Sequence, residues 1–179
     1  MGLSWSAMRK VLEQENICDS LKGRIQYFAT RYRDSHDQEG RVAVRLDGRE
    51  IFQSCFFDWQ AKRDAVVKSN FISKEQAESY WDYWDKVHLE TKNHGGFDQY
   101  GFYDAFHEYQ NESIEDSLSS ADPVVRLFAI LDRRTGKRRL QNMLSEIESQ
   151  PEWLQVFYKL RLESEGIIGI AKASQQKKS

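Results

Sequence analysis

Residues 31–41 combine side chains that acid–base catalysis and anion binding both use. The segment carries three arginines, one histidine and three carboxylates. A residue such as His36 or Glu39 can serve as a general base, and arginines can hold an anion between them. The same composition also fits a solvated loop whose charges neutralise one another, so hydrolysis and contact with a ligand or partner both stay open. The candidate binding residues of this segment are Arg31, Arg33, His36 and Arg41.

A second candidate is the basic corner, which we define as residues 132–139, with the sequence Asp-Arg-Arg-Thr-Gly-Lys-Arg-Arg. Residues 123–139 hold six Arg or Lys and one Asp, a net charge of +5. Residues 72–122, which we call the acidic stretch, hold twelve Asp or Glu and three Lys, a net charge of −9. The formal charge of −2 for the whole chain therefore conceals two segments of opposite sign.

The helix ends expected around the basic corner divide its cations into two groups. Arg133 and Arg134 follow an apolar helical pattern, and cations at a helix C-terminus offset the negative end of the dipole. Lys137, Arg138 and Arg139 open the next helical pattern, where the dipole does not stabilise them. These three cations are therefore solvated, paired with the acidic stretch inside the molecule, or used to bind an external anion or protein.

Three functional hypotheses follow from these two segments. Segregated charge favours a non-enzymatic interaction protein that docks a charged protein partner. Nucleic-acid or phosphate binding through Lys137, Arg138 and Arg139 is the alternative, although a sequence pI of about 6.1 is low for a dedicated nucleic-acid binder. The third hypothesis is a hydrolase that uses the His36–Glu39 loop. All three depend on whether residues 31–41 and the basic corner share one face.

Familiar catalytic and cofactor motifs are absent from the sequence. It contains no Walker A, Gly-x-Gly-x-x-Gly, Gly-x-Ser-x-Gly, His-Glu-x-x-His or Cys-x-x-Cys pattern. His88, His94 and His107 have no cysteine partners, and Asp104 with His107 offers only two ligands on one helix face. We therefore predict no metal site and no cofactor, and we favour a protein without enzymatic activity.

Aromatic residues are concentrated in the middle of the chain. Eleven of the 23 Phe, Tyr and Trp residues lie between Phe71 and Tyr109. Stacking on unpaired bases is one use for such rings, but helical spacing favours core packing for most of them. Tyr83 and Phe102 fall off the helical face, so we expect these two rings to be exposed contacts.

The first third of the chain predicts a helix followed by an antiparallel sheet. Residues 4–16 have helical spacing, and residues 24–32, 41–46 and 51–57 have the patterns of strands. Asp47-Gly48 between the last two strands predicts a two-residue hairpin turn. That turn predicts a register that pairs Leu46 with Arg49, Arg45 with Glu50, and Val44 with Ile51.

From Asp58 onward the sequence predicts helices. Ser73 with Gln76 forms a capping-box pattern at the start of one helix, and Gly95-Gly96 ends that helix. Asp122-Pro123 begins another. We expect an α+β fold: an N-terminal helix, a three-stranded antiparallel β-meander and a mostly helical C-terminal part.

Length and composition indicate one domain in a reducing compartment. We expect a single α+β domain over residues 1–170, with a sheet region at about 22–57, a helical region at about 58–166 and a disordered tail at 171–179. Two cysteines, no membrane-length apolar stretch and no signal-peptide pattern favour a cytoplasmic protein without membrane contact. The oligomeric state does not follow from these features.

Several strings carry a resemblance that runs along most of the chain. They are Gly-Leu-Ser-Trp-Ser at 2–6, Asp-Ser-Leu-Lys-Gly-Arg at 19–24, Thr-Arg-Tyr-Arg at 30–33, Asp-Gly-Arg-Glu-Ile at 47–51, Asp-Arg-Arg-Thr-Gly-Lys-Arg-Arg-Leu at 132–140 and Phe-Tyr-Lys-Leu-Arg at 157–161. On these strings the chain resembles an uncharacterised family of small bacterial proteins. The resemblance implies a cytoplasmic bacterial protein and transfers no site residues. Residues 58–118 carry little of it.

Overall fold

The computed structural model describes residues 4–34 and 40–169. Helix α1 (Trp5–Lys10) begins after Ser4, whose hydroxyl accepts a hydrogen bond of 3.3 Å from the amide of Ala7. The chain continues as a π-helical segment, η1 (Val11–Glu15), and a short turn, η2 (Asp19–Leu21). The helix predicted for residues 4–16 is therefore present, and its apolar side is buried through Met8 and Leu12.

Three antiparallel strands follow in the order β1-β2-β3: β1 (Ile25–Arg31), β2 (Gly40–Leu46) and β3 (Arg49–Cys55). Asp47 and Gly48 form the turn between β2 and β3, with φ angles of 51° and 80°. These positive angles confirm the predicted hairpin turn, which requires left-handed backbone at both positions.

The predicted hairpin register holds only next to the turn. Leu46 pairs with Arg49 and Arg45 with Glu50, but a bulge between Val44 and Arg45 pairs Val44 with Phe52 rather than with Ile51. The bulge brings the Phe52 ring into the core, where its centroid lies 5.4 Å from that of Phe97 and 4.6 Å from that of Trp153. Distant packing therefore overrides the register that the turn alone favours.

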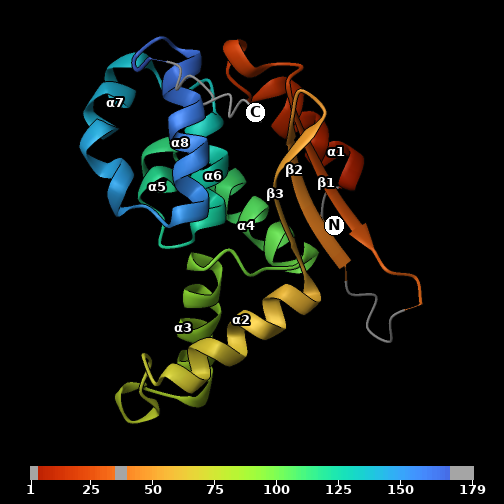
Figure 1. The fold of residues 1–179 in the computed structure, drawn as a ribbon, viewed down its shortest axis with the longest axis vertical. Helices are drawn as coiled ribbons and strands as arrows, with labels where there is room; N and C mark the ends of the chain where they lie inside the picture. Colours follow the sequence, from red (N-terminus) through yellow and green to blue (C-terminus); the bar gives the residue numbers. More distant parts are fainter. Residues whose placement is uncertain (1–3, 35–39, 170–179) are drawn as a thin grey trace, which may run out of the picture.

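The remainder of the chain is mostly helical, which confirms the α+β prediction (Figure 1). Its elements are α2 (Phe56–Ser69), η3 (Lys74–Gln76), α3 (Tyr80–Asn93), α4 (Gln99–Asn111), α5 (Ile114–Ser119), α6 (Pro123–Leu131), α7 (Lys137–Asn142), η4 (Met143–Ser149) and α8 (Glu152–Ser164). In the described part of the chain, no helix combines the length and apolar composition that a membrane crossing requires.

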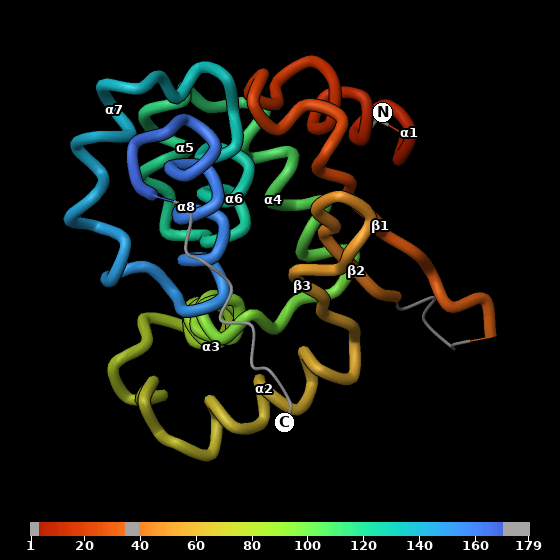
Figure 2. The backbone as a smooth tube through the Cα atoms, turned by 45° about the horizontal axis from the view of Figure 1, so that its top comes forward, coloured from red at the N-terminus to blue at the C-terminus, as the bar shows by residue number. Residues whose placement is uncertain are grey.

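Helix α6 forms the centre of the main core. It begins as predicted, with the Asp122 carboxylate accepting a hydrogen bond of 2.8 Å from the amide of Val124, and every residue except Arg126 is buried. Figure 2 shows α6 among α4, α5 and α8, with the sheet beside them. The Phe128 ring lies 5.0 Å from Phe102 of α4 and 5.9 Å from Tyr27 of β1, so it joins the helices to the sheet.

Helices α2 and α3 form an arm, which we define as residues 56–93, that projects from this body (Figure 1). The arm has a small cluster of its own, in which only Val66, Tyr83 and Val87 are buried. Within the described residues, the main core lies outside the arm. The described residues therefore form two apolar clusters of very different size. The single domain predicted for residues 1–170 stays a prediction, and the tail predicted at 171–179 lies outside the described residues.

The start of α3 differs from the prediction. Ser73 accepts a hydrogen bond of 3.2 Å from the amide of Glu75, but it caps only the short turn η3. Ala77 then adopts an extended conformation, and Ser79 caps α3 by accepting a hydrogen bond of 3.1 Å from the amide of Asp82. The predicted end is confirmed, since α3 stops at Asn93, just before Gly95 and its φ of 73°.

Replacing Gly48 with alanine should lower the free energy of unfolding by about 1–2 kcal/mol, because a Cβ atom is unfavourable in left-handed backbone. Gly169 provides a matched control: no atom lies within 4 Å of a Cβ built at either glycine, but the backbone of Gly169 is not left-handed. Gly169→Ala should change the unfolding free energy by about 0.5 kcal/mol or less. Urea denaturation measures both variants, and equal losses would contradict the conformational explanation.

Candidate functional site

The basic corner is anchored by a buried carboxylate, Asp132, which is 1% exposed. The Tyr109 hydroxyl of α4 donates a hydrogen bond to it, and the Arg134 guanidinium donates two more, at 2.9 and 2.7 Å. Asn16 donates a hydrogen bond of 3.0 Å to the Tyr109 hydroxyl oxygen. The backbone of Ile17 pairs with that of Asp132, so the start of the chain, α4 and the corner meet at this carboxylate.

This environment changes the ionisation of the groups around Asp132. Burial, together with the charge of Asp132, raises the pKa of the Tyr109 phenol well above its ordinary range. The hydrogen bonds to Asp132 raise the pKa of the Arg134 guanidinium as well. Tyr109 is therefore a neutral donor and Arg134 a permanent cation, so both serve the structure rather than proton transfer.

A second buried charged residue, Arg161 of α8, contacts the corner from inside the molecule. Its guanidinium donates a hydrogen bond of 3.0 Å to the carbonyl oxygen of Thr135 and one of 3.3 Å to the Ser20 hydroxyl. It also forms an ion pair with Glu165. Because Thr135 lies in the middle of the corner, these contacts fix the corner to α8 and η2.

The five exposed or partly exposed cations of the corner differ in whether an acidic side chain lies near them. Arg139 forms an ion pair with Glu115 of the acidic stretch, and the Lys137 Nζ lies 3.8 Å from a carboxylate oxygen of Glu165. Arg133 and Arg138 are exposed and have no acidic partner within the described residues. An internal partner therefore satisfies part of the positive charge, and these two arginines carry the remainder.

The explanation predicted for Arg133 and Arg134 is wrong in its detail. Helix α6 ends at Leu131, and Asp132 after it is extended, so neither arginine lies in the last helical turn. Arg134 has a structural partner, but that partner is the Asp132 side chain and not the helix end.

An open hollow of about 610 Å³ lies at the corner. Its lining residues are Arg134, Gly136, Lys137, Arg138, Arg139 and Asn142. Four cations therefore surround a surface depression that can accommodate a carboxylate or phosphate group.

Arg31 and Arg41, near the two described ends of the 31–41 segment, contact other side chains of the fold. The Arg31 guanidinium lies 5.8 Å from the centroid of the Tyr100 ring. Arg41 pairs with Glu50 and donates a hydrogen bond of 2.6 Å to Gln53 of β3. Arg33 is exposed. His36 and the rest of the His36–Glu39 loop lie outside the described residues, so the hydrolase hypothesis stays a prediction.

The described ends of the 31–41 segment and the basic corner do not share one face. Asp132 pairs with Ile17, which precedes β1, whereas Arg31 lies at the far end of β1. Seven strand residues span about 20 Å. Figure 1 shows α7 and this end of β1 on opposite sides of the molecule. A single anion surface built from both segments is therefore absent from the described structure.

The expected exposure of Tyr83 and Phe102 is wrong. Tyr83 is 5% exposed in the cluster of the arm, and Phe102 is fully buried against Phe128. The exposed rings of α3 are Tyr80 and Trp81, which are 67% and 73% exposed. Helical spacing identifies which rings share a face, but the neighbouring elements decide which face is buried.

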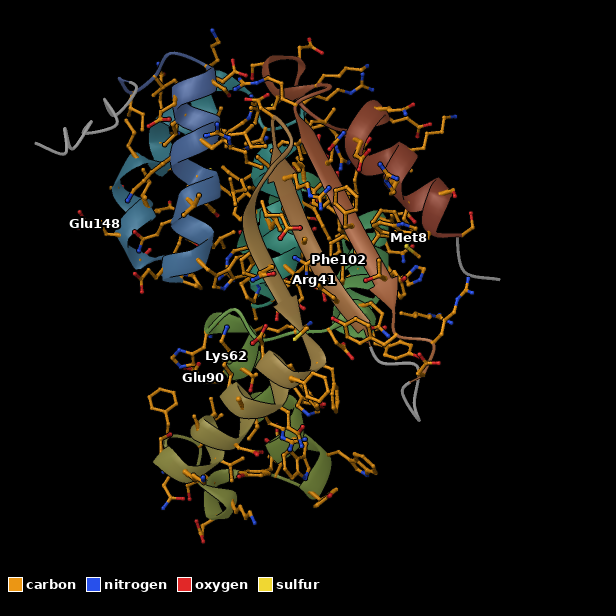
Figure 3. All side chains as sticks on the ribbon, turned by 45° about the vertical axis from the view of Figure 1, so that its right-hand side comes forward. Met8, Arg41, Lys62, Glu90, Phe102 and Glu148 are labelled. Atoms are coloured by element: carbon orange, nitrogen blue, oxygen red, sulfur yellow. The ribbon has the colours of Figure 1, made fainter. Side chains whose placement is uncertain are left out.

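Two further hollows meet at His94, where the arm joins the body. One of about 1000 Å³ lies between the end of α3 and the segments around Arg126 and Trp153. The other, of about 620 Å³, is lined by residues of the arm that include Lys62 and Glu90, both labelled in Figure 3. Sequence reasoning missed these hollows because residues far apart in the chain form them. Among the described residues, no three His, Cys, Asp or Glu side chains gather as a metal site.

Comparison with known proteins identifies a family. A model described as the SF0329 protein family matches residues 4–162. The match includes the basic corner and the arm, and it passes through residues 58–118, which contribute little to the strings quoted above. No curated protein and no solved structure matches the chain.

Removing the Asp132 carboxylate should destabilise the protein strongly. Asp132→Ala should lower the free energy of unfolding by about 2–4 kcal/mol, because the buried Tyr109 hydroxyl loses its acceptor. Tyr109→Phe should cost about 1 kcal/mol, since Arg134 still neutralises the carboxylate. Glu15→Ala, which removes only an exposed pair with Lys10, is the control and should cost about 0.5 kcal/mol or less. A loss for Asp132→Ala no larger than that of the control would contradict the anchoring role.

His88 of the arm should titrate below the ordinary range of histidine. Its ring lies 5.8 Å from Trp59 and 6.0 Å from Trp84, and burial lowers its pKa. Arg63 and Lys92 act in the same direction, whereas Asp85 and Asp98 oppose it. The folded state therefore favours the neutral imidazole. This contribution to stability is complete above the pKa of histidine in the unfolded chain, and it is lost as the pH falls from there through the lower pKa of His88 in the folded protein.

An NMR titration of the His88 ring protons measures this pKa directly. Trp59→Ser should move the midpoint back toward that of an exposed histidine, because it removes one burying ring. A wild-type midpoint at or above the ordinary value would show that Asp85 and Asp98 outweigh burial.

Proposed function

The chain belongs to the SF0329 protein family, and we propose that it acts as a non-enzymatic binding protein whose basic corner docks an acidic segment of a protein partner. The observation that supports this proposal is the incomplete neutralisation of the corner. Arg133 and Arg138 are exposed without an acidic partner among the described residues, and Arg138 also helps to line the hollow.

The internal ion pairs of the corner can be exchanged for contacts with a partner. Arg139 and Glu115 are 35% and 62% exposed, and an ion pair in water contributes little to stability. Lys137 is 68% exposed and lies at the limit of ion-pair distance from Glu165. A carboxylate that enters the hollow therefore competes with weak contacts, while Asp132 and Arg161 keep the backbone beneath it in place.

A short acidic protein segment fits the corner better than an extended polyanion does. The positive surface is confined to one side of the molecule, because Arg31 and Arg33 lie near the far end of β1. The acidic stretch borders the corner at Glu115, so the repeated charges of DNA would meet carboxylates there. Nucleic-acid or phosphate binding through Lys137, Arg138 and Arg139 is the alternative that the hollow also supports.

We also propose that the protein resides in the cytoplasm, which is a reducing compartment. Cys18 and Cys55 are both free thiols, and Cys18 is buried as a small apolar side chain. Free cysteines of this kind are typical of proteins in reducing compartments.

A binding titration with defined probes tests the role of the corner. A fluorescent peptide rich in Glu and Asp should bind the full chain with an affinity that falls as salt concentration rises. The double variant Arg133→Glu, Arg138→Glu should weaken binding by roughly tenfold or more. Lys68→Glu, which reverses an exposed charge of the arm, is the control and should leave the affinity unchanged.

Two further probes separate the alternatives. A DNA duplex or inorganic phosphate that binds more tightly than the peptide, and is lost in the same double variant, would favour the alternative over the proposal. Peptide binding that is equally weak in the wild-type chain, the corner variant and the Lys68→Glu control would remove the corner as a binding site.

A further inference from the structure

A continuous row of neighbouring rings runs along the arm, and we call it the aromatic strip. Along the row, the centroids of neighbouring rings are between 5.3 and 6.3 Å apart. In order from the body to the tip of the arm, its members are Phe57, Phe56, Trp59, His88, Trp84, Tyr80 and Trp81. Both helices of the arm therefore contribute to one apolar surface.

The aromatic strip is largely uncovered. Phe57, Tyr80 and Trp81 are 68%, 67% and 73% exposed. With about 150–250 Å² for a whole aromatic side chain, these three rings leave about 400 Å² in water. Apolar patches of this size on a monomer are often functional, and a stable protein interface covers about 800 Å² on each partner. The three rings therefore supply about half of such an interface, before their neighbours are included.

The arm has little apolar packing of its own to stabilise it. The only buried apolar side chains of the arm are Val66, Tyr83 and Val87. A surface helix gains most of its stability by burying an apolar face, and the ring face of α3 is turned to solvent. A partner on the aromatic strip would bury that face.

The charge of the arm helps to select the partner. Residues 56–93 contain seven Asp or Glu and six Lys or Arg, a net charge of −1. Arg63 pairs with Asp64 at 2.8 Å, and Lys86 pairs with Asp82 at 2.9 Å. A nearly neutral surface with internally paired charges neither attracts nucleic acid or anionic membrane nor repels another arm.

We propose that the aromatic strip is the contact between two copies of this chain. Figure 3 shows the arm extending away from the sheet, so two arms can lie side by side while the bodies remain apart. In a two-fold pair, the Phe57 end of one strip meets the Trp81 end of the other, and each copy buries the same residues. The basic corner lies on the body, so it stays accessible in such a dimer.

Sedimentation equilibrium of the full chain tests this proposal across micromolar to high-micromolar concentrations. The wild-type chain should show a monomer–dimer equilibrium, and Trp81→Ser should raise the dimer dissociation constant by roughly tenfold or more. Phe71→Ser is the matched control: Phe71 is 74% exposed on the same arm but lies off the strip, beside the hollow near Lys62. The control should dimerise as the wild-type chain does, with both variants retaining the wild-type circular dichroism spectrum.

Salt separates this contact from docking at the corner. At about 1 M salt the dimer should persist, because burial of apolar surface is not screened, whereas charge-driven peptide binding should be lost. A monomer at every concentration would overturn the proposal. Equal weakening by the two variants would also overturn it, as would binding to neutral lipid vesicles that requires Trp81 in a chain that stays monomeric.

Discussion

The Asp132 carboxylate is the interaction on which the arrangement of the body depends. A charged group that is buried away from water must be paired and hydrogen-bonded. The partners of Asp132 are Tyr109 of α4 and Arg134. Tyr109 in turn is held by Asn16. Because the partners come from different segments of the chain, these contacts fix the relative position of α4, the N-terminal segment and the end of α6.

The same network explains why the basic corner is exposed. Asp132 and Arg161 hold its backbone from inside, so most of its cationic side chains are not needed for packing and point outward. Internal carboxylates then neutralise Arg139 and approach Lys137, but they leave Arg133 and Arg138 unmatched. The buried charges therefore build the support, and the exposed charges form the surface available for recognition.

Local signals in the sequence predicted local structure well. Asp47-Gly48 and Asp122-Pro123 specify a turn and a helix start through neighbouring backbone, and both are present. The bulge beside Val44 was not predictable, because it depends on Phe52 meeting Trp153 a hundred positions later. Tyr83 was misplaced for a similar reason, since its burial depends on where α2 lies. Charge counting left an acidic partner inside the molecule as one of several alternatives. The structure identifies Glu115 as that partner for Arg139, and it separates Arg31 from the corner.

The arm enters and leaves the body at one point. The Ser54 hydroxyl of β3 accepts a hydrogen bond of 3.0 Å from the amide of Phe97, so residues on either side of the arm are adjacent in space. Gly95 lies there against Trp153, whose indole N–H donates a hydrogen bond of 2.9 Å to the carbonyl oxygen of Lys92. In topological terms the arm is an insertion whose ends already touch. Such a module can be lengthened, shortened or exchanged without changing how the strands connect to α4, so the body and the arm are free to diverge separately.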